Sequence, residues 1–238
     1  MLLGLTIPNA SHAVAERLLD TMIGAAIATL FSYVLPSWEF SALPRLVRAV
    51  LKTNRDYIDA SRDLLQGRSA DDFLYRLHRK RFMDNLASLS SAVVRMLDEP
   101  ADRRDIAEEI NRFIVQNYLV VAHLAAVRLI LRRERERLPL EAVNRVLQQA
   151  FHRLAGTLEM AQKGWGAGAT ASPKAPPLAA VEVEPDGEPL AGDDAQAKTW
   201  SGWTALARRI DLLHLDAQQI AVSSEAIRSI LASTAGSK

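Results

Sequence analysis

Apolar and polar residues alternate along most of this chain with the three- and four-residue spacing of amphipathic helices. Between Leu43 and Leu65 the apolar positions follow steps of four and three residues, and the pattern ends at Gln66–Gly67. A second pattern begins after Ser69, which can cap a helix, and ends at Glu99–Pro100. Because this period places apolar side chains on one helix face, we expect both segments to pack against other helices.

A third helix is expected from about residue 101 to residue 137, and its middle is unusually apolar. From Phe113 to Leu131, 15 of 19 residues are apolar. The polar residues of this stretch fall on one arc of about 140° at 100° per residue: Gln116, Asn117, His123 and Arg128. An Arg or His near the centre of a bilayer costs several kcal/mol, so we interpret the segment as a buried bundle helix whose polar arc finds partners on adjacent helices.

The rest of the chain, from residue 138 on, contains two more helical patterns and a segment of different composition. Pro139 opens a fourth helix that continues to about Lys163. Residues 164–199 hold five of the ten prolines, five of the eleven glycines and six acidic residues, which predicts a disordered acidic linker. From residue 200 to the end, apolar positions again follow three- and four-residue steps. This amphipathic helix docks either on the bundle or on a neighbouring chain.

The segment Leu18–Leu35 differs from the others because it is apolar on all sides. Fourteen of its 18 residues are apolar or glycine, its only charged residue is Asp20, and Pro36 follows it. These features predict a short membrane span. The alternative is a buried helix of a soluble protein, because a span usually needs about 20 residues.

Charged and small residues around this segment refine the prediction. Four basic residues follow it with no acidic residue between them, which predicts a cytoplasmic location for the C-terminal side: Arg45, Arg48, Lys52 and Arg55. Small residues recur every fourth position, Gly24 among them, and this spacing lets another membrane helix approach closely. No basic residue precedes the first apolar stretch, so we expect no cleaved signal peptide.

These patterns together predict an all-α protein with four parts. We expect a membrane segment in residues 1–40, a cytosolic antiparallel helical bundle in 41–163, the linker in 164–199 and a C-terminal helix in 200–238. The bundle is expected to fold independently of the other parts.

Composition excludes several classes of protein. Among 238 residues, 29 basic side chains balance 28 acidic ones, which argues against a dedicated nucleic-acid binder. Cysteine is absent, so disulfides, thiolate metal sites and cysteine nucleophiles are excluded. The five histidines are isolated, no phosphate-binding loop or nucleophile elbow occurs, and paired carboxylates lie among arginines as on solvated helix faces. We therefore expect neither an enzyme nor a metal or cofactor site.

Two groups of residues are candidates for function. A basic run could contact anionic lipid headgroups, although a solvated helix face is the simpler interpretation: Arg76, Arg79, Lys80 and Arg81. Arg17 and Asp20, three residues apart at the end of the predicted span, could pair with each other or with polar groups of adjacent spans. The alternative for these two is snorkelling to the interface.

Several spaced motifs resemble one family of membrane proteins. The segments Arg17-Leu18-Leu19-Asp20-Thr21-Met22-Ile23-Gly24 and Leu35-Pro36-Ser37-Trp38-Glu39 resemble the last membrane repeat of the fusaric acid resistance, or aromatic acid exporter, family. Tyr75-Arg76 with Arg79, then Asn85, Leu89 and Met96-Leu97-Asp98-Glu99-Pro100, resemble the cytosolic helical part of its longer members, as does Arg112-Phe113-Ile114.

The resemblance covers about Arg17 to Arg132 and implies a bacterial inner-membrane protein that exports aromatic carboxylic acids or similar compounds. It also implies partners, namely membrane lipid, further spans or self-association, and a periplasmic adaptor. Because the family uses many spans and this chain offers one, we interpret it as the C-terminal portion of such a transporter, from a truncated frame or a separate short member. The alternative is a membrane-anchored helical interaction module without transport activity.

Overall fold

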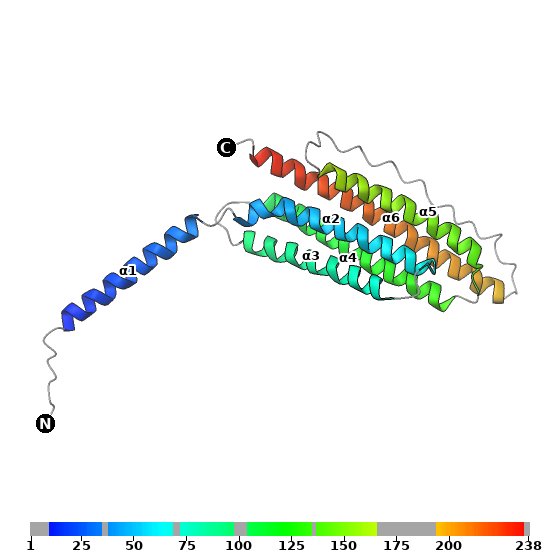
Figure 1. Ribbon diagram of the computed structural model, residues 1–238, viewed down its shortest axis with the longest axis horizontal. Helices are drawn as coiled ribbons and strands as arrows, with labels where there is room; N and C mark the ends of the chain where they lie inside the picture. The colour runs from blue at the N-terminus through cyan, green and yellow to red at the C-terminus, as the bar shows by residue number, and fades with distance from the viewer. Residues whose placement is uncertain are drawn as a thin grey trace, which may run out of the picture. The chain divides into compact units, whose positions relative to one another are not determined.

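The fold is all-α, as predicted. The computed structural model describes residues 10–34, 38–68, 72–97, 104–134, 137–165 and 194–235, and these ranges contain helices and no strand (Figure 1). The helices are α1 (Ala10–Val34), α2 (Trp38–Leu65), α3 (Phe73–Leu97), α4 (Arg104–Arg133), α5 (Leu140–Gly164) and α6 (Asp194–Ala235). Most of the predicted linker, residues 166–193, lies outside the described residues.

The helix boundaries agree with the turn and cap residues of the sequence. Helix α2 ends at Leu65, and Gly67 follows with φ of 68°, a left-handed conformation that glycine adopts without a steric penalty. Helix α5 starts directly after Pro139, whose φ of −65° suits a helix start. Two helices begin earlier than expected: α2 starts at Trp38, and α6 starts at Asp194, within the segment assigned to the linker.

The chain forms two compact units, Met1–Ser41 and Ala42–Lys238. In the first unit, every described side chain from Val14 to Phe31 is exposed. The predicted span coincides with α1 except at Leu35, which lies outside the described residues.

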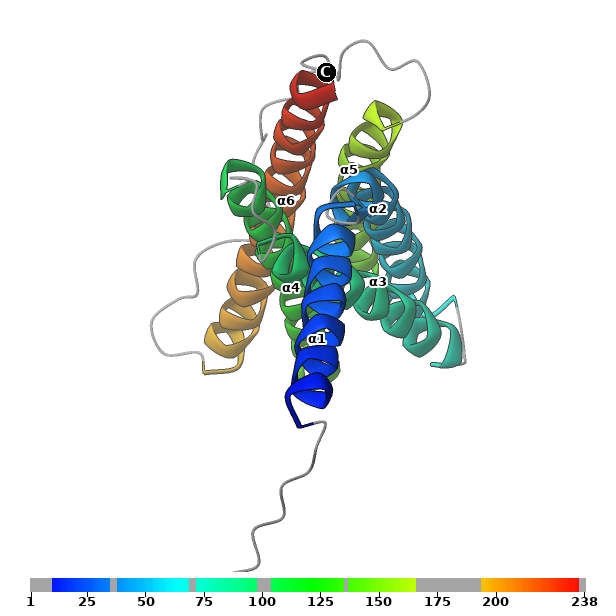
Figure 2. The same cartoon turned by 90° about the vertical axis from the view of Figure 1, so that its left-hand side faces the viewer.

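The second unit is a helical bundle in which consecutive helices α2 to α5 alternate in direction, as predicted (Figure 1, Figure 2). Helix α6 runs antiparallel to α4: Gly202 lies beside Glu134, and His123 contacts Asp216. It runs parallel to α5, since Gly202 lies near Leu138 and His214 contacts Ala150, a constant offset of 64 residues.

Helix α6 docks on this bundle, which settles where the terminal helix packs. Its apolar stripe is buried at Trp203, Leu206, Ile210, Leu213, Ala217, Ile220 and Ile227. A Cβ at Gly202 would lie 3.3 Å from the Cγ of Glu134, so a small residue there allows α6 to approach α4 closely. The compact unit therefore extends from residue 42 through α6 instead of ending at residue 163, because α6 covers an apolar face of α4 and α5.

Within the described residues, α4 is the single helix long and apolar enough to cross a membrane. Core helices of soluble proteins share these properties, and ten α4 residues are buried in the bundle, including Phe113, Asn117 and Leu124. In α1, the described side chains run from Val14 to Phe31, and this stretch of 18 residues includes three charged residues, Glu16, Arg17 and Asp20. The membrane span expected in α1 therefore stays a prediction. The assignment of α4 to the bundle thus agrees with its packing.

Candidate functional site

The three candidate residues of α1 lie on an open helix surface. Arg17 and Asp20 are exposed, and no ion pair joins them or links either to another described residue. A Cβ added at Gly24 would meet nothing within 4 Å. The hydroxyls of Thr21 and Thr29 donate to the carbonyl oxygens of Arg17 and Ala25, each at 2.7 Å. Both threonine hydroxyls thus bond within the helix, and the described apolar side chains of α1 are exposed.

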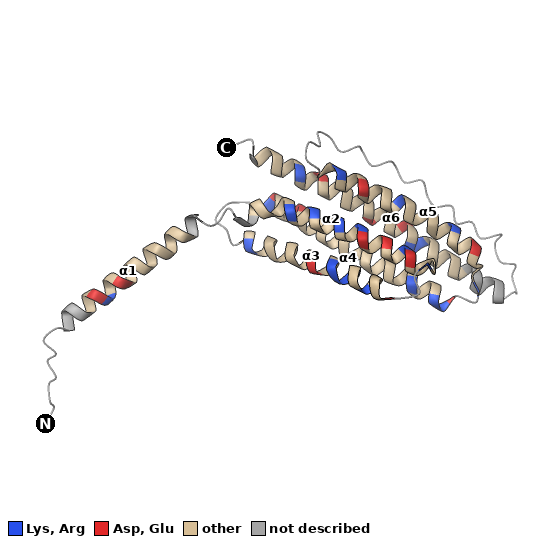
Figure 3. Cartoon of the chain, viewed as in Figure 1, with Lys and Arg blue, Asp and Glu red and all other residues tan. Residues whose placement is uncertain are grey.

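The basic run lies on the N-terminal half of α3, where Figure 3 shows a cluster of Lys and Arg. All four side chains are exposed: Arg76, Arg79, Lys80 and Arg81. The Nζ of Lys80 lies 2.7 Å from the Oδ2 of Asp84, one turn further along the helix. Such exposed pairs are typical of a solvated face, and contact with anionic lipid stays a prediction.

Three of the four polar residues in the α4 arc, Asn117, His123 and Arg128, have partners on or next to three other helices. Asn54 of α2 donates from Nδ2 to the Oδ1 of Asn117 at 2.7 Å, and both side chains are fully buried. Asn117 in turn donates to the carbonyl oxygen of Phe113 at 2.7 Å. The Oδ1 of Asn54 has no hydrogen-bond partner among the described residues. This contact fixes the register of α2 against α4.

Arg128 joins the end of α4 to the start of α3. Its Nη2 donates to the Oδ2 of Asp72 at 3.1 Å, and its guanidinium lies 5.0 Å from the ring centroid of Tyr75. Tyr75 also contacts Tyr57, with ring centroids 5.6 Å apart. Burial and the contact with Tyr75 raise the pKa of Tyr57 far above its ordinary value, so its hydroxyl stays protonated.

His123 joins α4 to α6 through a mostly buried pair. Its Nδ1 lies 2.7 Å from the Oδ2 of Asp216, and the two side chains are 12% and 6% exposed. Burial raises the pKa of Asp216, an effect that the hydrogen bond with His123 opposes. Nearby, His214 lies with Nε2 3.1 Å from the carbonyl oxygen of Ala150, and burial lowers the pKa of this imidazole.

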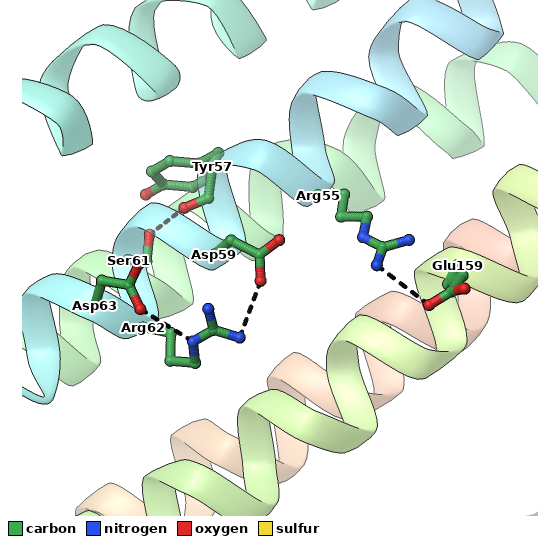
Figure 4. A network of polar contacts seen from close by, with 7 residues as sticks. All are labelled: Arg55, Tyr57, Asp59, Ser61, Arg62, Asp63 and Glu159. Atoms are coloured by element: carbon green, nitrogen blue, oxygen red, sulfur yellow. Dashed lines mark hydrogen bonds and ion pairs between the residues drawn. The ribbon is translucent and has the colours of Figure 1, made fainter.

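Ion pairs on the surface add a contact between α2 and α5 (Figure 4). The Nη2 of Arg55 lies 3.2 Å from the Oε2 of Glu159. Along α2, Arg62 pairs with Asp59 and Asp63, and Ser61 donates to the carbonyl oxygen of Tyr57. The charged side chains of these ion pairs are partly exposed, so they contribute specificity more than stability.

A cavity of about 450 Å³ lies where α2 and α4 end and α5 begins. Apolar side chains form most of its wall: Leu64, Leu65, Leu131, Leu138, Leu140 and Val143. Four polar residues also line it: Gln66, Arg128, Arg132 and Asn144. The Oε1 of Gln66 is buried and has no hydrogen-bond partner among the described residues. An apolar wall beside Arg132 suits a small organic anion, whereas the guanidinium of Arg128 is already paired with Asp72.

No group of three or more potential metal ligands comes together in the part of the chain that the structure describes.

Comparison with known proteins relates 39% to 50% of the chain to one inner membrane protein and two uncharacterized proteins. It is 31% identical over 112 residues to inner membrane protein YccS of Escherichia coli (strain K12), which covers 47% of this chain and 16% of that protein. It is 28% identical over 120 residues to an uncharacterized protein of Haemophilus influenzae, covering 50% and 17%. It is 34% identical over 95 residues to uncharacterized protein ORF2 of Neisseria gonorrhoeae, covering 39% and 23%.

The chain therefore spans about a sixth to a quarter of the length of these relatives. No family model matches the chain. No solved structure matches it either. Similarity to an inner membrane protein agrees with the expectation of a membrane protein, while membership of the exporter family stays a prediction.

Sequence reasoning missed the residues that complete the polar contacts. It identified Asn117, His123 and Arg128 as one arc but named no partner for them. Asp216 carried a signal, because it stands next to the buried positions of a regular apolar stripe on α6. Nothing in the sequence marked Asp72 as a partner, since an acidic residue at the start of a helix is already explained by its attraction to the helix N-terminus.

Proposed function

We propose that this chain is the membrane-anchored cytosolic part of a bacterial inner-membrane exporter of aromatic or similar small organic acids. The observation that carries the proposal is the match between half of this chain and a sixth of inner membrane protein YccS. In this proposal α1 crosses the inner membrane and α2 to α6 lie in the cytoplasm. A single helix cannot enclose a solute pathway, so the pathway requires further spans.

The chemistry of α1 supports a membrane location. Large apolar side chains are exposed along it, among them Leu19, Met22 and Phe31. Its threonine hydroxyls donate within the helix, as a hydrocarbon environment requires. Basic residues follow at the start of α2, and this asymmetry favours a cytoplasmic C-terminal side.

The cavity of the bundle supports an organic acid as the ligand. Arg132 supplies positive charge at one side, next to Arg128 with its partner Asp72, and leucines supply an apolar wall for a ring or short chain. Its volume of about 450 Å³ falls within the range of small-molecule sites. In the proposed exporter this cavity receives the acid on the cytoplasmic side.

Binding and export test the proposal together. We expect the purified full chain to bind 4-hydroxybenzoate by calorimetry and Arg132→Gln to lose most of that binding. Arg133→Gln, a neighbouring arginine outside the cavity wall, is the matched control and should bind as the wild type does. Cells that carry the chain with the further spans of its locus should export the acid faster than cells without it. No binding and no export would contradict the proposal.

The exposed apolar face of α4 favours a second candidate, a membrane-anchored helical interaction module without transport activity. Val115, Leu119 and Leu129 are exposed on this face. A chain that is anchored and assembled, yet neither binds nor exports the acid, would support this candidate instead.

A further inference from the structure

Helix α4 has a second apolar face, opposite the one that it buries in the bundle. Its exposed apolar residues recur every three or four positions: Val115, Tyr118, Leu119, Ala122, Ala125 and Leu129. At 100° per residue, this stripe lies across the helix from buried Phe113, Asn117 and Leu124. Of the 18-residue stretch that makes α4 apolar enough to cross a membrane, only 39% is buried within the chain. Such a face is expected to be covered by a partner.

Opposite charges stand at the two ends of this stripe. Glu108, near the N-terminal end, pairs with Arg112 one turn along the helix, and its side chain is 75% exposed. Arg133, at the C-terminal end, lies 3.6 Å from the neighbouring Glu134, and its side chain is 82% exposed. By helical spacing both residues fall on the same side of α4 as Val115 and Leu119. The midpoint between positions 108 and 133 falls in the middle of the apolar stripe, between residues 120 and 121.

We infer that the exposed face of α4 is an interface between two copies of this chain, in which α4 packs antiparallel against α4 of the second copy. A two-fold axis between residues 120 and 121 places Glu108 opposite Arg133 of the other copy, twice by symmetry. The same register places Leu119 opposite Ala122 and Val115 opposite Ala126. Large side chains face small ones at these two pairs, which allows close packing near the axis, whereas Leu129 lies opposite Arg112.

Two other arrangements fit the same face less well. Parallel packing would place Glu108 against Glu108 and Arg133 against Arg133, and large side chains against large ones. Insertion of this face into a bilayer would bring α6 along with it, because α6 packs along α4 and exposes Arg208 and Asp211. Charged groups near hydrocarbon are costly, so a protein surface is the better match.

Because the chain contains no cysteine, introduced cysteines can test the register directly. Glu108→Cys and Arg133→Cys variants of the full chain are expressed separately and together, and their membranes are oxidised before any detergent is added. We expect a disulfide-linked dimer only when both variants are present. Two copies of position 108 would lie about 37 Å apart in this register, at 1.5 Å per residue, so neither variant alone should cross-link.

Charge reversal tests the same pairing in an otherwise unmodified chain. Glu108→Arg and Arg133→Glu should each weaken the dimer about tenfold, measured by light scattering of the detergent-solubilised chain over a dilution series, and the combined variant should recover most of the loss. Leu119→Asp should give monomers with unchanged helix content by circular dichroism. Leu74→Asp is the control, because Leu74 is also exposed but lies beside Asp56 and Asp59 of α2, away from the α4 face.

Three results would overturn the inference. Cross-linking of Glu108→Cys with itself would indicate parallel packing. A wild-type chain that is monomeric and does not cross-link would show that no second copy covers this face. Protection of Leu119→Cys from water-soluble maleimide in membranes, without any dimer, would place the face in lipid. None of these results depends on export or on binding of an organic acid.

Discussion

The Nδ1 of His123 and the Oδ2 of Asp216 lie 2.7 Å apart and join α4 to α6 across 93 residues of sequence. Both side chains are mostly buried, so neither can exchange its partner for water without local opening. The pair therefore specifies where α6 docks along α4, whereas the apolar stripe around it supplies most of the stabilising area.

Removing one member of this pair should destabilise the bundle more than removing both. We expect Asp216→Leu or His123→Leu alone to lower the free energy of unfolding by about 2 kcal/mol, because the remaining polar group is buried without a partner. The double variant should lie within about 1 kcal/mol of the wild type. Chemical denaturation of the four proteins measures the coupling, and strictly additive losses would contradict it.

His214 should make the docking of α6 sensitive to acid. Burial lowers its pKa in the folded protein below the ordinary value of about 6.5. At a pH where this histidine is neutral in both the folded and the unfolded state, its pKa shift does not change the free energy of unfolding. As the pH falls, the unfolded chain takes up a proton before the folded protein does, and this lowers the free energy of unfolding. Between pH 7 and pH 5, the melting temperature of the wild type should therefore fall relative to that of His214→Gln.

Asp216 changes stability with pH in the opposite direction, but it is present in both the wild type and His214→Gln, so its effect cancels in their difference. Its pKa is raised by burial, so its protonation favours the folded state as the pH falls. A difference between the two proteins that is constant across this pH range would contradict the role assigned to His214.

The buried amide pair of α2 and α4 should behave like the pair of α4 and α6. Asn117→Ala leaves the Nδ2 of Asn54 without an acceptor, so we expect a loss of about 2 kcal/mol in the free energy of unfolding. The double variant Asn54→Leu with Asn117→Leu should recover at least half of that loss, because it removes both polar groups. Thermal denaturation followed by circular dichroism measures this. Equal losses in the single and double variants would be the contrary result.

Substitutions in α1 should separate insertion from assembly. A side chain at Gly24 meets nothing within 4 Å, so Gly24→Leu should insert as well as the wild type. It should nevertheless prevent close approach of another span and reduce assembly several-fold in membrane cross-linking. Asp20→Asn should leave insertion and folding unchanged and affect only ion pairing with other spans. Normal assembly of Gly24→Leu would remove this position from helix contacts.

The sequence predicts the helices of this protein far better than the contacts between them. Apolar spacing together with Gly67, Pro100 and Pro139 sufficed for the order and approximate ends of α2 to α5, because these signals act within one or two turns. The start of α6 at Asp194 was missed, since Pro, Gly and acidic residues just before it suggested a linker up to residue 199. A composition average does not resolve a boundary within such a stretch.

Partners across helices could not be predicted for a different reason. Periodicity gives the face of each helix but not its axial register against another helix. The sequence therefore placed His123 and Arg128 on one arc and required partners for them, yet Asp216 and Asp72 became identifiable only once α6 and α3 were positioned. The cavity beside Arg128 and Arg132 likewise depends on three helix ends that are far apart in sequence.

Accessibility of single cysteines in whole cells tests most directly the claim that α1 anchors a cytosolic bundle in the inner membrane. Glu16→Cys and Arg48→Cys each add one thiol to a cysteine-free chain, at the two ends of the predicted span. A membrane-impermeant maleimide should label Glu16→Cys in intact spheroplasts, and Arg48→Cys only after the membrane is permeabilised. The chain should also remain in the membrane fraction after a carbonate wash. Labelling of neither thiol before permeabilisation, together with release of the chain by the wash, would contradict the account.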